Sequence, residues 1–357
     1  MKPSRCTART LIEFPILNQA AVRVLSEFKP TFIHLRERGL ISSPESGLTN
    51  PSRPDPRNNS SSSTHPQVPK AMQELREFRL DVGDIELAGI EWPGHGDPVL
   101  LLHATGFHSR CWNQVVKGLP GRHIYAMDLR FHGNSGSLGA ADWGLMAEDI
   151  HRAVELLNLE QLVGVGHSIG GHLIARAAAR TPQRFKHLVL IDPVIMSAER
   201  YAQFQHYFTD LQASDHPVSR RKNQWQDARE MYERFKERAP FNTWQPQVLR
   251  DYCDYALRPA DENALHQLAC DPVNEVGIYL NQKGNEIVLK ELPKIVTPVT
   301  LLRAPPGENG LPDLSASPTW PGLAAALPNC TEVYLSELNH FIPMQAPELV
   351  ANYIRAA

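Results

Sequence analysis

The sequence has little of what marks secreted scaffolds, membrane proteins or nucleic-acid binders. Its 357 residues include five scattered cysteines and no C-x-x-C pair, so a disulfide framework is not expected and a reducing compartment is. No apolar run is long enough to span a bilayer. A net charge of −3 favours neither nucleic acid nor an anionic membrane as a partner. We therefore expect a soluble cytoplasmic enzyme with a small-molecule substrate; the oligomeric state stays open.

Metal and cofactor signals are also missing. The chain has 15 histidines, but His103, His108, His132 and His172 show no paired zinc spacing such as H-E-x-x-H. We therefore expect no metal site, and the sequence implies no cofactor.

Residues 1–71 differ in composition from the remainder. Ser42 to Pro69 is dominated by Ser, Pro and Asn, which predicts a disordered linker. Thr10 to Leu35 is more apolar but lacks the continuous core of a secretory signal. Three interpretations stay open: a genuine extension, an organellar targeting segment, or a mis-called start with translation beginning at Met72.

The most informative feature that is present is the pentapeptide Gly166-His167-Ser168-Ile169-Gly170. An apolar run, Leu162–Val165, precedes it, and an Ala-rich helical stretch, Gly171–Ala179, follows. In a strand, G-x-S-x-G, helix context the serine sits on a sharp turn with its hydroxyl exposed. The flanking glycines suit so tight a turn because a Cβ would clash there. The pattern predicts that Ser168 is a nucleophile and that His167 packs beside it as a brace.

Apolar runs alternate with helical patterns on both sides of this turn. Such alternation predicts a parallel sheet covered on both faces. Two further segments around Gly83-Asp84 alternate in polarity and predict an antiparallel hairpin at the sheet edge. The expected strands are Phe78–Val82, Ile85–Glu91, Pro98–His103, Ile124–Asp128, Leu162–Val165, His187–Pro193, Pro298–Arg303 and Thr331–Leu335.

At these residues the sequence resembles the α/β-hydrolase superfamily, in its serine-nucleophile, lidded branch. The resemblance begins near Glu77 and includes the serine turn, a His-Gly-type loop at His103-Ala104, the Asp-x-Arg-x-His-Gly-x-Ser segment Asp128–Ser135 and the late pair His340-Phe341. It implies a mostly parallel central sheet flanked by helices, with a helical cap inserted after the sixth strand. The order serine, acid, histidine along the chain is also the one this fold uses. Asp128–Ser135 is expected to be structural.

A serine nucleophile needs a base, and the base needs an acid behind it. The resemblance makes His340 the base, since the loop after the last strand brings it over Ser168. Relatives most often carry the acid in a Gly-x-x-Asp turn after the strand that follows the cap, where this chain has Gly307. Asp192, at the end of the preceding strand, is the expected acid, and Glu308 is the alternative.

The resemblance also implies an oxyanion hole of two backbone N–H groups. Ile169 is expected to supply one, aided by the positive end of its helix. Thr105 is expected to supply the other. Ala104 stands where relatives carry glycine and restricts the backbone, which leaves the path of this loop open.

The predicted domains are a core, 72–195 with 295–357, and a helical cap, 196–294. Helix-spaced apolar residues such as Tyr201, Phe204, Phe208 and Leu211 indicate the cap. Trp225, Phe241, Trp244 and Tyr279 suit either cap core or pocket lining. Arg220-Arg221-Lys222 is expected to be a solvated turn. Leu268–Glu275 resembles a segment of a little-characterised bacterial and fungal branch, which names no substrate.

The predicted mechanism is two-step acyl transfer through Ser168, His340 and Asp192, with an ester as the expected substrate class. Thioesters, amides, lactones and a carbon–carbon bond in a diketone stay open, because these reactions share one constellation. A serine rather than an aspartate at the turn argues against epoxide hydrolysis and dehalogenation. The competing hypothesis is a ligand-binding α/β-hydrolase with little or no catalysis, suggested by the absent Gly-x-x-Asp acid.

Overall fold

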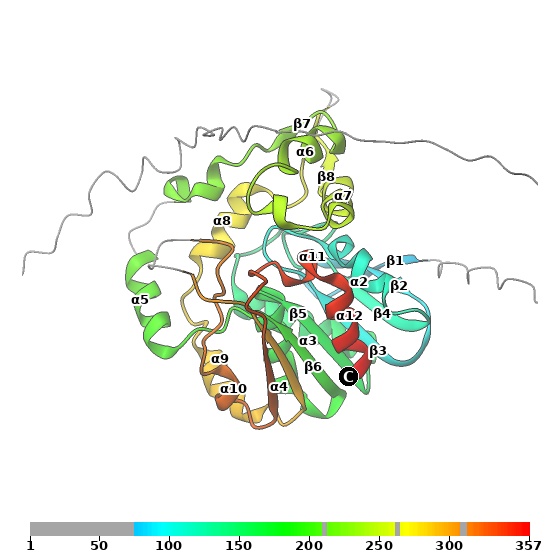
Figure 1. Ribbon diagram of the computed structural model, residues 1–357, viewed down its shortest axis with the longest axis vertical. Coiled ribbons are helices and arrows are strands. Elements are labelled where there is room, and N and C mark those ends of the chain that lie inside the picture. The colour runs from blue at the N-terminus through cyan, green and yellow to red at the C-terminus, as the bar shows by residue number, and fades with distance from the viewer. Residues whose placement is uncertain (1–74, 209–212, 261–264, 308–312) are drawn as a thin grey trace, which may run out of the picture. The chain divides into compact units, whose positions relative to one another are not determined.

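The computed structural model describes residues 75–208, 213–260, 265–307 and 313–357 (Figure 1). All of them belong to one compact unit, Val68–Ala357. The predictions for residues 1–71, Leu211 and Glu308 lie outside the described residues.

An eight-stranded sheet forms the centre of this unit, in the order β1-β2-β4-β3-β5-β6-β10-β11. Strand β2 pairs antiparallel with β1 and β4, and the other neighbouring pairs are parallel. The mostly parallel sheet with an antiparallel hairpin at its edge is therefore confirmed. The strands are β1 (Arg76–Asp81), β2 (Glu86–Trp92), β3 (His95–Leu102), β4 (Arg122–Met127), β5 (Leu162–His167), β6 (Phe185–Ile191), β10 (Val299–Arg303) and β11 (Cys330–Tyr334).

Helices cover both faces of the sheet because alternate strand side chains point to opposite sides. In β3, Leu100 and Leu102 join the apolar cluster of α3 and α4. Val99 and Leu101 join the cluster of α2 and α12 on the other face. The helices of the core are α2 (Asn113–Lys117), α3 (Trp143–Leu156), α4 (Ile169–Arg180), α9 (Ile287–Glu291), α10 (Leu323–Ala326), α11 (Ile342–Gln345) and α12 (Pro347–Ala356).

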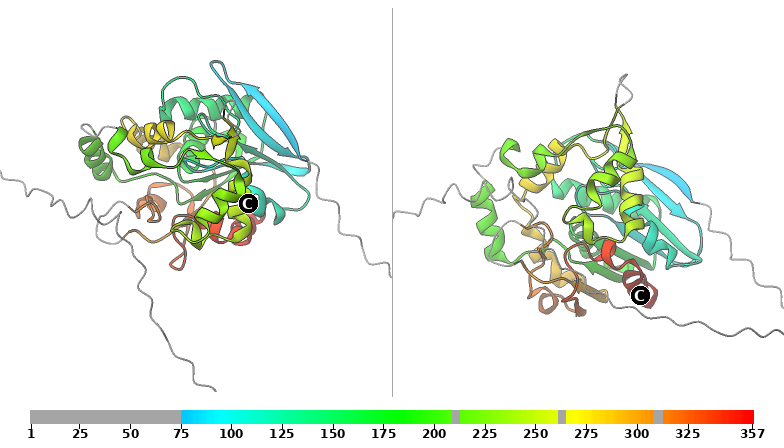
Figure 2. Two further views of the ribbon diagram at one scale, coloured as in Figure 1. Left: turned by 90° about the horizontal axis from the view of Figure 1, so that it is seen from above. Right: turned by 45° about the horizontal axis from the view of Figure 1, so that its top comes forward.

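An insertion between β6 and β10 carries the expected helices and one unexpected element. Its helices are α5 (Ala198–Phe208), α6 (Ala228–Phe235), α7 (Pro246–Tyr255) and α8 (Pro272–Leu280), followed by α9, which packs against α4 of the core. A small antiparallel sheet, β7-β9-β8, joins Gln224–Trp225, His266–Leu268 and Leu257–Pro259. Strands of two or three residues are too short to show a period of two, so the sequence did not predict them. Figures 1 and 2 show the yellow-green helices α6 and α7 over one end of the sheet.

The aromatic side chains of the insertion mostly pack against one another and against the core. Trp225 is 1% exposed and Trp244 is 5% exposed. Both belong to an apolar cluster that also contains Phe107 and Phe341 of the core. The ring of Tyr279 instead stacks on a histidine of the insertion. The ring of Trp244 lies between insertion and core, against Phe107 and Phe341, whereas Trp225 packs on Phe235 of the insertion.

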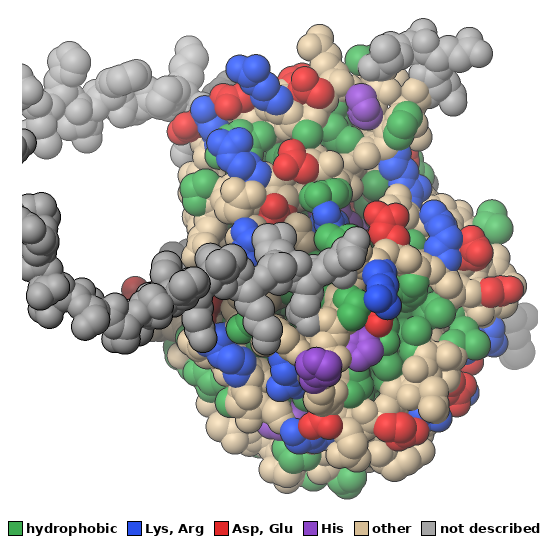
Figure 3. Space-filling model, turned by 90° about the vertical axis from the view of Figure 1, so that its right-hand side faces the viewer, with side chains coloured by type: hydrophobic (Ala, Val, Ile, Leu, Met, Phe, Trp, Pro, Cys, Tyr) green, Lys and Arg blue, Asp and Glu red, His purple; other side chains and the backbone are tan. Residues whose placement is uncertain are grey.

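Two general features of the described part bear on its partners. None of its helices combines the length and the apolar character that crossing a bilayer requires. On the face shown in Figure 3, basic and acidic side chains are interspersed rather than gathered by sign.

Candidate active site

Ser168 lies on a strained turn between β5 and α4. Its backbone has φ +57° and ψ −119°, a conformation that non-glycine residues seldom adopt. The flanking glycines leave no space for side chains: a Cβ on Gly166 would collide with the carbonyl of Gly170, and a Cβ on Gly170 would meet the carbonyls of Leu102 and His103. The predicted sharp turn from strand to helix is therefore present.

Asp192 and His340 are in direct contact. Asp192 follows β6, is fully buried and has a positive φ of +44°. Its Oδ2 lies 2.7 Å from Nδ1 of His340, which is on the loop after β11. When the neutral ring carries its proton on Nδ1 and donates it to this carboxylate, the other ring nitrogen of His340, Nε2, is unprotonated and can act as a base.

The loop after β10 supplies hydrogen-bond donors to Asp192. The N–H of Ala304 donates to Oδ1 over 3.0 Å, and the hydroxyl of Ser317 donates over 2.6 Å. The hydroxyl of Thr319 lies 3.3 Å from the same oxygen and donates its proton to the carbonyl of Pro193 over 2.7 Å. Since β10 pairs with β6, this loop lies beside Asp192. Relatives most often carry the acid in the loop after β10. In this chain that loop orients the carboxylate of Asp192, which follows the neighbouring strand β6.

His167 ties the serine turn to the loop of His340. Its Nε2 donates to the carbonyl oxygen of His340 over 2.8 Å, and the two rings lie 5.0 Å apart. Burial lowers the pKa of His167 well below its usual range, so the ring is neutral. The N–H of His340 also donates to the carbonyl of Ser315 over 2.8 Å. The side chain next to Ser168 thus fixes the backbone of His340, in keeping with the expected bracing role.

The loop that carries Thr105 is held by two neutral histidines. The left-handed φ of this loop falls on Gly106, at +79°, and not on Ala104, so alanine fits where relatives have glycine. The N–H of Gly106 donates to Nε2 of His132 over 2.9 Å. Burial lowers the pKa of His132 to about 4. His103 accepts from the N–H of Leu129 in the same way, over 3.0 Å.

The two N–H groups expected to bind the oxyanion lie at the start of helix α4 and just after strand β3. Ile169 is the first residue of α4, where an N–H has no acceptor within the helix. Thr105 follows the end of β3 by three residues and is 7% exposed. Both main-chain groups therefore come from the same end of the sheet as Ser168.

The Asp128–Ser135 segment has structural contacts. The guanidinium of Arg130 bonds Asp149 through two nitrogens, each over 2.7 Å, and also pairs with Asp84. Asp128 accepts from the N–H of Ser109 over 2.7 Å. These contacts fix the loop that carries His132, as expected of a structural segment.

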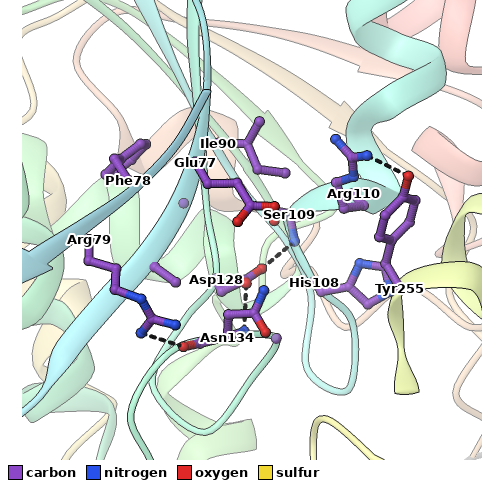
Figure 4. Close-up of a pocket in the computed structure, with 13 residues that line it drawn as sticks. Glu77, Phe78, Arg79, Ile90, His108, Ser109, Arg110, Asp128, Asn134 and Tyr255 are labelled. Atoms are coloured by element: carbon purple, nitrogen blue, oxygen red, sulfur yellow. Dashed lines mark hydrogen bonds between the residues drawn. The ribbon is translucent and has the colours of Figure 1, made fainter. Parts of the chain in front are cut away.

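The described part also contains a cavity of about 360 Å³, and Figure 4 shows the side chains that line it. It opens between β1, β2 and the loop before α2. Asp128 lines it, together with Glu77, Arg79, Arg110 and Tyr255. Neither Ser168, Asp192 nor His340 is among its lining residues, so this cavity is separate from the candidate site. Among the described residues, no group of three or more His, Cys, Asp or Glu side chains is arranged to hold a metal ion.

The insertion places an ion pair, a half-buried arginine with a buried glutamate, against the Thr105 loop. Arg221 pairs with Glu275 of α8, and Glu275 is 3% exposed. Nη2 of Arg221 also donates to the hydroxyl of Tyr252 over 3.0 Å. Burial raises the pKa of Glu275, and the Arg221 guanidinium opposes that shift. The prediction of a solvated turn is therefore wrong for Arg221. Its partner lies 54 residues later in the chain, and no local pattern links the two.

Comparison with known proteins agrees with this fold. Residues 97–268 match the family model described as alpha/beta hydrolase fold. A serine hydrolase-like protein of Danio rerio is 35% identical over 123 residues, 32% of this chain and 37% of that protein. Lipase LipV of Mycobacterium tuberculosis is 37% identical over 99 residues, 27% of this chain and 37% of that protein. The chain thus matches less than half the length of these curated relatives.

Solved structures align over most of the described part. An E-2-(acetamidomethylene)succinate hydrolase has a TM-score of 0.64 at 20% identity, over 79% of this chain and 98% of that one. A thioesterase domain from the curacin biosynthetic pathway has a TM-score of 0.61 at 19% identity, over 79% and 99%. These likenesses show the fold. The match of residues 97–268 to the family model agrees with them, and the described part has the α/β-hydrolase fold.

Proposed function

We propose that the protein is a serine hydrolase that cleaves a small carboxylic ester, or a related carbonyl compound, through an acyl-enzyme. The observation that carries the proposal is the 2.7 Å contact between His340 Nδ1 and Asp192 Oδ2, on a loop tied by His167 to the turn of Ser168. A serine hydroxyl is activated for attack by a histidine whose ring is oriented by a buried carboxylate. Ser168, on the sharp turn between β5 and α4, is the serine of this arrangement.

In the first step, Ser168 Oγ attacks the substrate carbonyl carbon while His340 Nε2 takes the hydroxyl proton. The carbonyl oxygen becomes an oxyanion that accepts hydrogen bonds from the N–H groups of Thr105 and Ile169. Collapse of the tetrahedral intermediate breaks the bond to the leaving group, which takes the proton from His340. Asp192 stabilises the transient imidazolium and keeps the ring in the productive tautomer.

In the second step, water attacks the acyl carbon and gives its proton to His340. The new tetrahedral intermediate releases the carboxylic acid, and Ser168 regains its proton. No group outside the protein and water is needed to balance either step. A serine at the turn forms an acyl ester, whereas epoxide hydrolysis and dehalogenation in this fold use an aspartate.

The scissile bond is proposed to be an ester because an ester is the least demanding carbonyl for a serine nucleophile. Thioesters, amides, lactones and a carbon–carbon bond in a diketone are the other substrates that the same constellation serves. A ligand-binding role with little turnover is the second candidate. It is favoured by the low exposure of the two reacting side chains, 6% for Ser168 and 8% for His340.

Turnover of a substrate panel tests the proposal. We expect hydrolysis of a short-chain p-nitrophenyl ester, with kcat falling about 10³-fold or more in Ser168→Ala, since truncation of an elbow serine removes the covalent route. Ser336→Ala, an exposed serine, is the matched control and should retain wild-type turnover. Activity that survives in Ser168→Ala would refute the serine mechanism. A folded wild type inactive on ester, thioester, amide, lactone and diketone would favour the binding role.

A further inference from the structure

Two opposite charges of the insertion meet the backbone of the Thr105 loop. A Cβ built on Gly106 would lie 2.6 Å from Oε1 of Glu275 and 3.4 Å from Nη1 of Arg221. Both charged groups therefore lie close to the α-carbon of Gly106, the residue after Thr105. The same loop bears the N–H group proposed to bind the oxyanion.

Helix α8, which carries Glu275, is anchored at both ends. Asp271 caps its first turn by accepting from the N–H of Val273 over 2.8 Å, and accepts from the amide of Asn223 over 3.0 Å. At the other end, Nε1 of Trp143 in the core donates to the carbonyl of Ile278 over 2.9 Å. Because these contacts join the helix to the insertion and to the core, the position of Glu275 over Gly106 is fixed.

Stability gives little reason for an ion pair at this place. Apolar side chains of similar volume often stabilise a buried site as well as an ion pair does, because a buried charge loses its hydration. That loss applies to Glu275, whereas the side chain of Arg221 is 22% exposed. A lone carboxylate would also oppose the negative charge that develops on a substrate oxygen held by the Thr105 N–H. Arg221, paired with Glu275 and bonded to Tyr252, cancels that repulsion.

We infer that Arg221 is a positioning residue for the proposed reaction: it neutralises Glu275 at the Thr105–Gly106 loop, so that the oxyanion forms beside a net neutral pair. The inference rests on the proposed function and assigns a catalytic consequence to an insertion side chain that touches neither Ser168 nor His340. It also predicts an asymmetry. Loss of the arginine leaves a carboxylate that opposes the oxyanion at any pH above the raised pKa of Glu275. Loss of the glutamate leaves a positive charge, which does not oppose it.

The test is a double-mutant cycle with Arg221→Met, Glu275→Gln and the double variant, measured as kcat and KM for an ester that the wild type turns over. We expect kcat of Arg221→Met to fall roughly 50-fold, from the Coulomb repulsion of a charge several ångströms away at an effective dielectric near 20. KM should change less than about threefold, because the oxyanion is absent from the bound substrate and forms only during the reaction. The double variant should recover most of the lost kcat.

Controls separate this role from a structural one. Arg176→Met breaks a comparable pair, 2.9 Å from Glu291 and 16% exposed, away from the loop; it should lower the melting temperature and leave kcat unchanged. Arg221→Lys keeps the charge and should stay within a few-fold of wild type. Glu275→Gln alone should keep or raise kcat, which can be measured even if Arg221→Met fails to fold.

Three results would overturn the inference. They are an unchanged kcat in a folded Arg221→Met, a loss in Glu275→Gln as large as that in Arg221→Met, or a double variant no better than Arg221→Met. Each is read with a wild type whose turnover depends on Ser168, so the proposed function stands in all three. A wild type without such turnover would refute the proposed function itself, and this inference with it.

Discussion

The core and the insertion hold their candidate functional side chains by different means. In the core, Ser168 and Asp192 each follow the carboxyl end of a strand directly and are fixed by backbone hydrogen bonds. In the insertion, Arg221 and Glu275 lie 54 residues apart and are held by side-chain contacts, with each other and, for Arg221, with Tyr252. The core thus defines where chemistry can occur, and the insertion adjusts the charge around it. Changes in the two regions should differ in kind as well as in size.

The largest effect is expected from Asp192→Asn in the core. We expect kcat to fall about 10³- to 10⁴-fold, because an amide no longer holds His340 in the tautomer that leaves Nε2 free. Asparagine tolerates the positive φ at this position, so the backbone should not be strained. Ester hydrolysis together with a melting curve measures both consequences.

Two controls make this result specific. Thr319→Val removes a hydroxyl that lies 3.3 Å from Asp192 and donates to the carbonyl of Pro193 over 2.7 Å, and it should cost only a few-fold in kcat. Glu308→Gln should have no effect. A large loss in Glu308→Gln with a small loss in Asp192→Asn would move the acid to Glu308 and contradict the assignment.

A smaller effect, on stability, is expected from adding one methyl group to either region. Gly170→Ala should lower the free energy of unfolding by about 3 kcal/mol or more, because the new Cβ would lie 2.7 Å from the backbone oxygen of His103. Gly277→Ala in α8 should change it by less than about 1 kcal/mol. Its Cβ would meet only Ala141, at 3.3 Å, and alanine favours helix over glycine.

Urea unfolding followed by circular dichroism compares the two glycine variants. Equal losses of stability, or a tolerated Gly170→Ala, would show that the serine turn is less tightly packed than its contacts indicate. A strongly destabilised Gly277→Ala would show that the contact between α8 and the core is packed more tightly than its distances indicate.

The sequence predicted the core well because its signals are local. The apolar runs are strands, and Asp192, placed at the end of one of them, contacts His340. The G-x-S-x-G turn needs its glycines for steric reasons that the sequence already suggests. The contact of Asp192 with His340 could be inferred because few positions lie at a strand end next to β5. The role of Asp192 as the acid stays a prediction.

Contacts between distant segments could not be predicted in the same way. The Arg221–Glu275 pair has no sequence period, and the turn that contains Arg221 resembled a solvated one. The strands β7, β8 and β9 are each two or three residues long, shorter than any alternation that can be recognised. The bond from Gly106 to His132 also depends on how two loops meet at the end of the sheet.

Labelling with a fluorophosphonate, read by intact mass, tests the central claim most directly. The probe forms a stable bond only with an activated serine hydroxyl and needs no knowledge of the substrate. We expect one adduct on the wild type, none on Ser168→Ala and slower labelling of Asp192→Asn. A folded wild type that takes up no probe, or a Ser168→Ala variant that still takes up one, would contradict the assignment of Ser168 as the nucleophile.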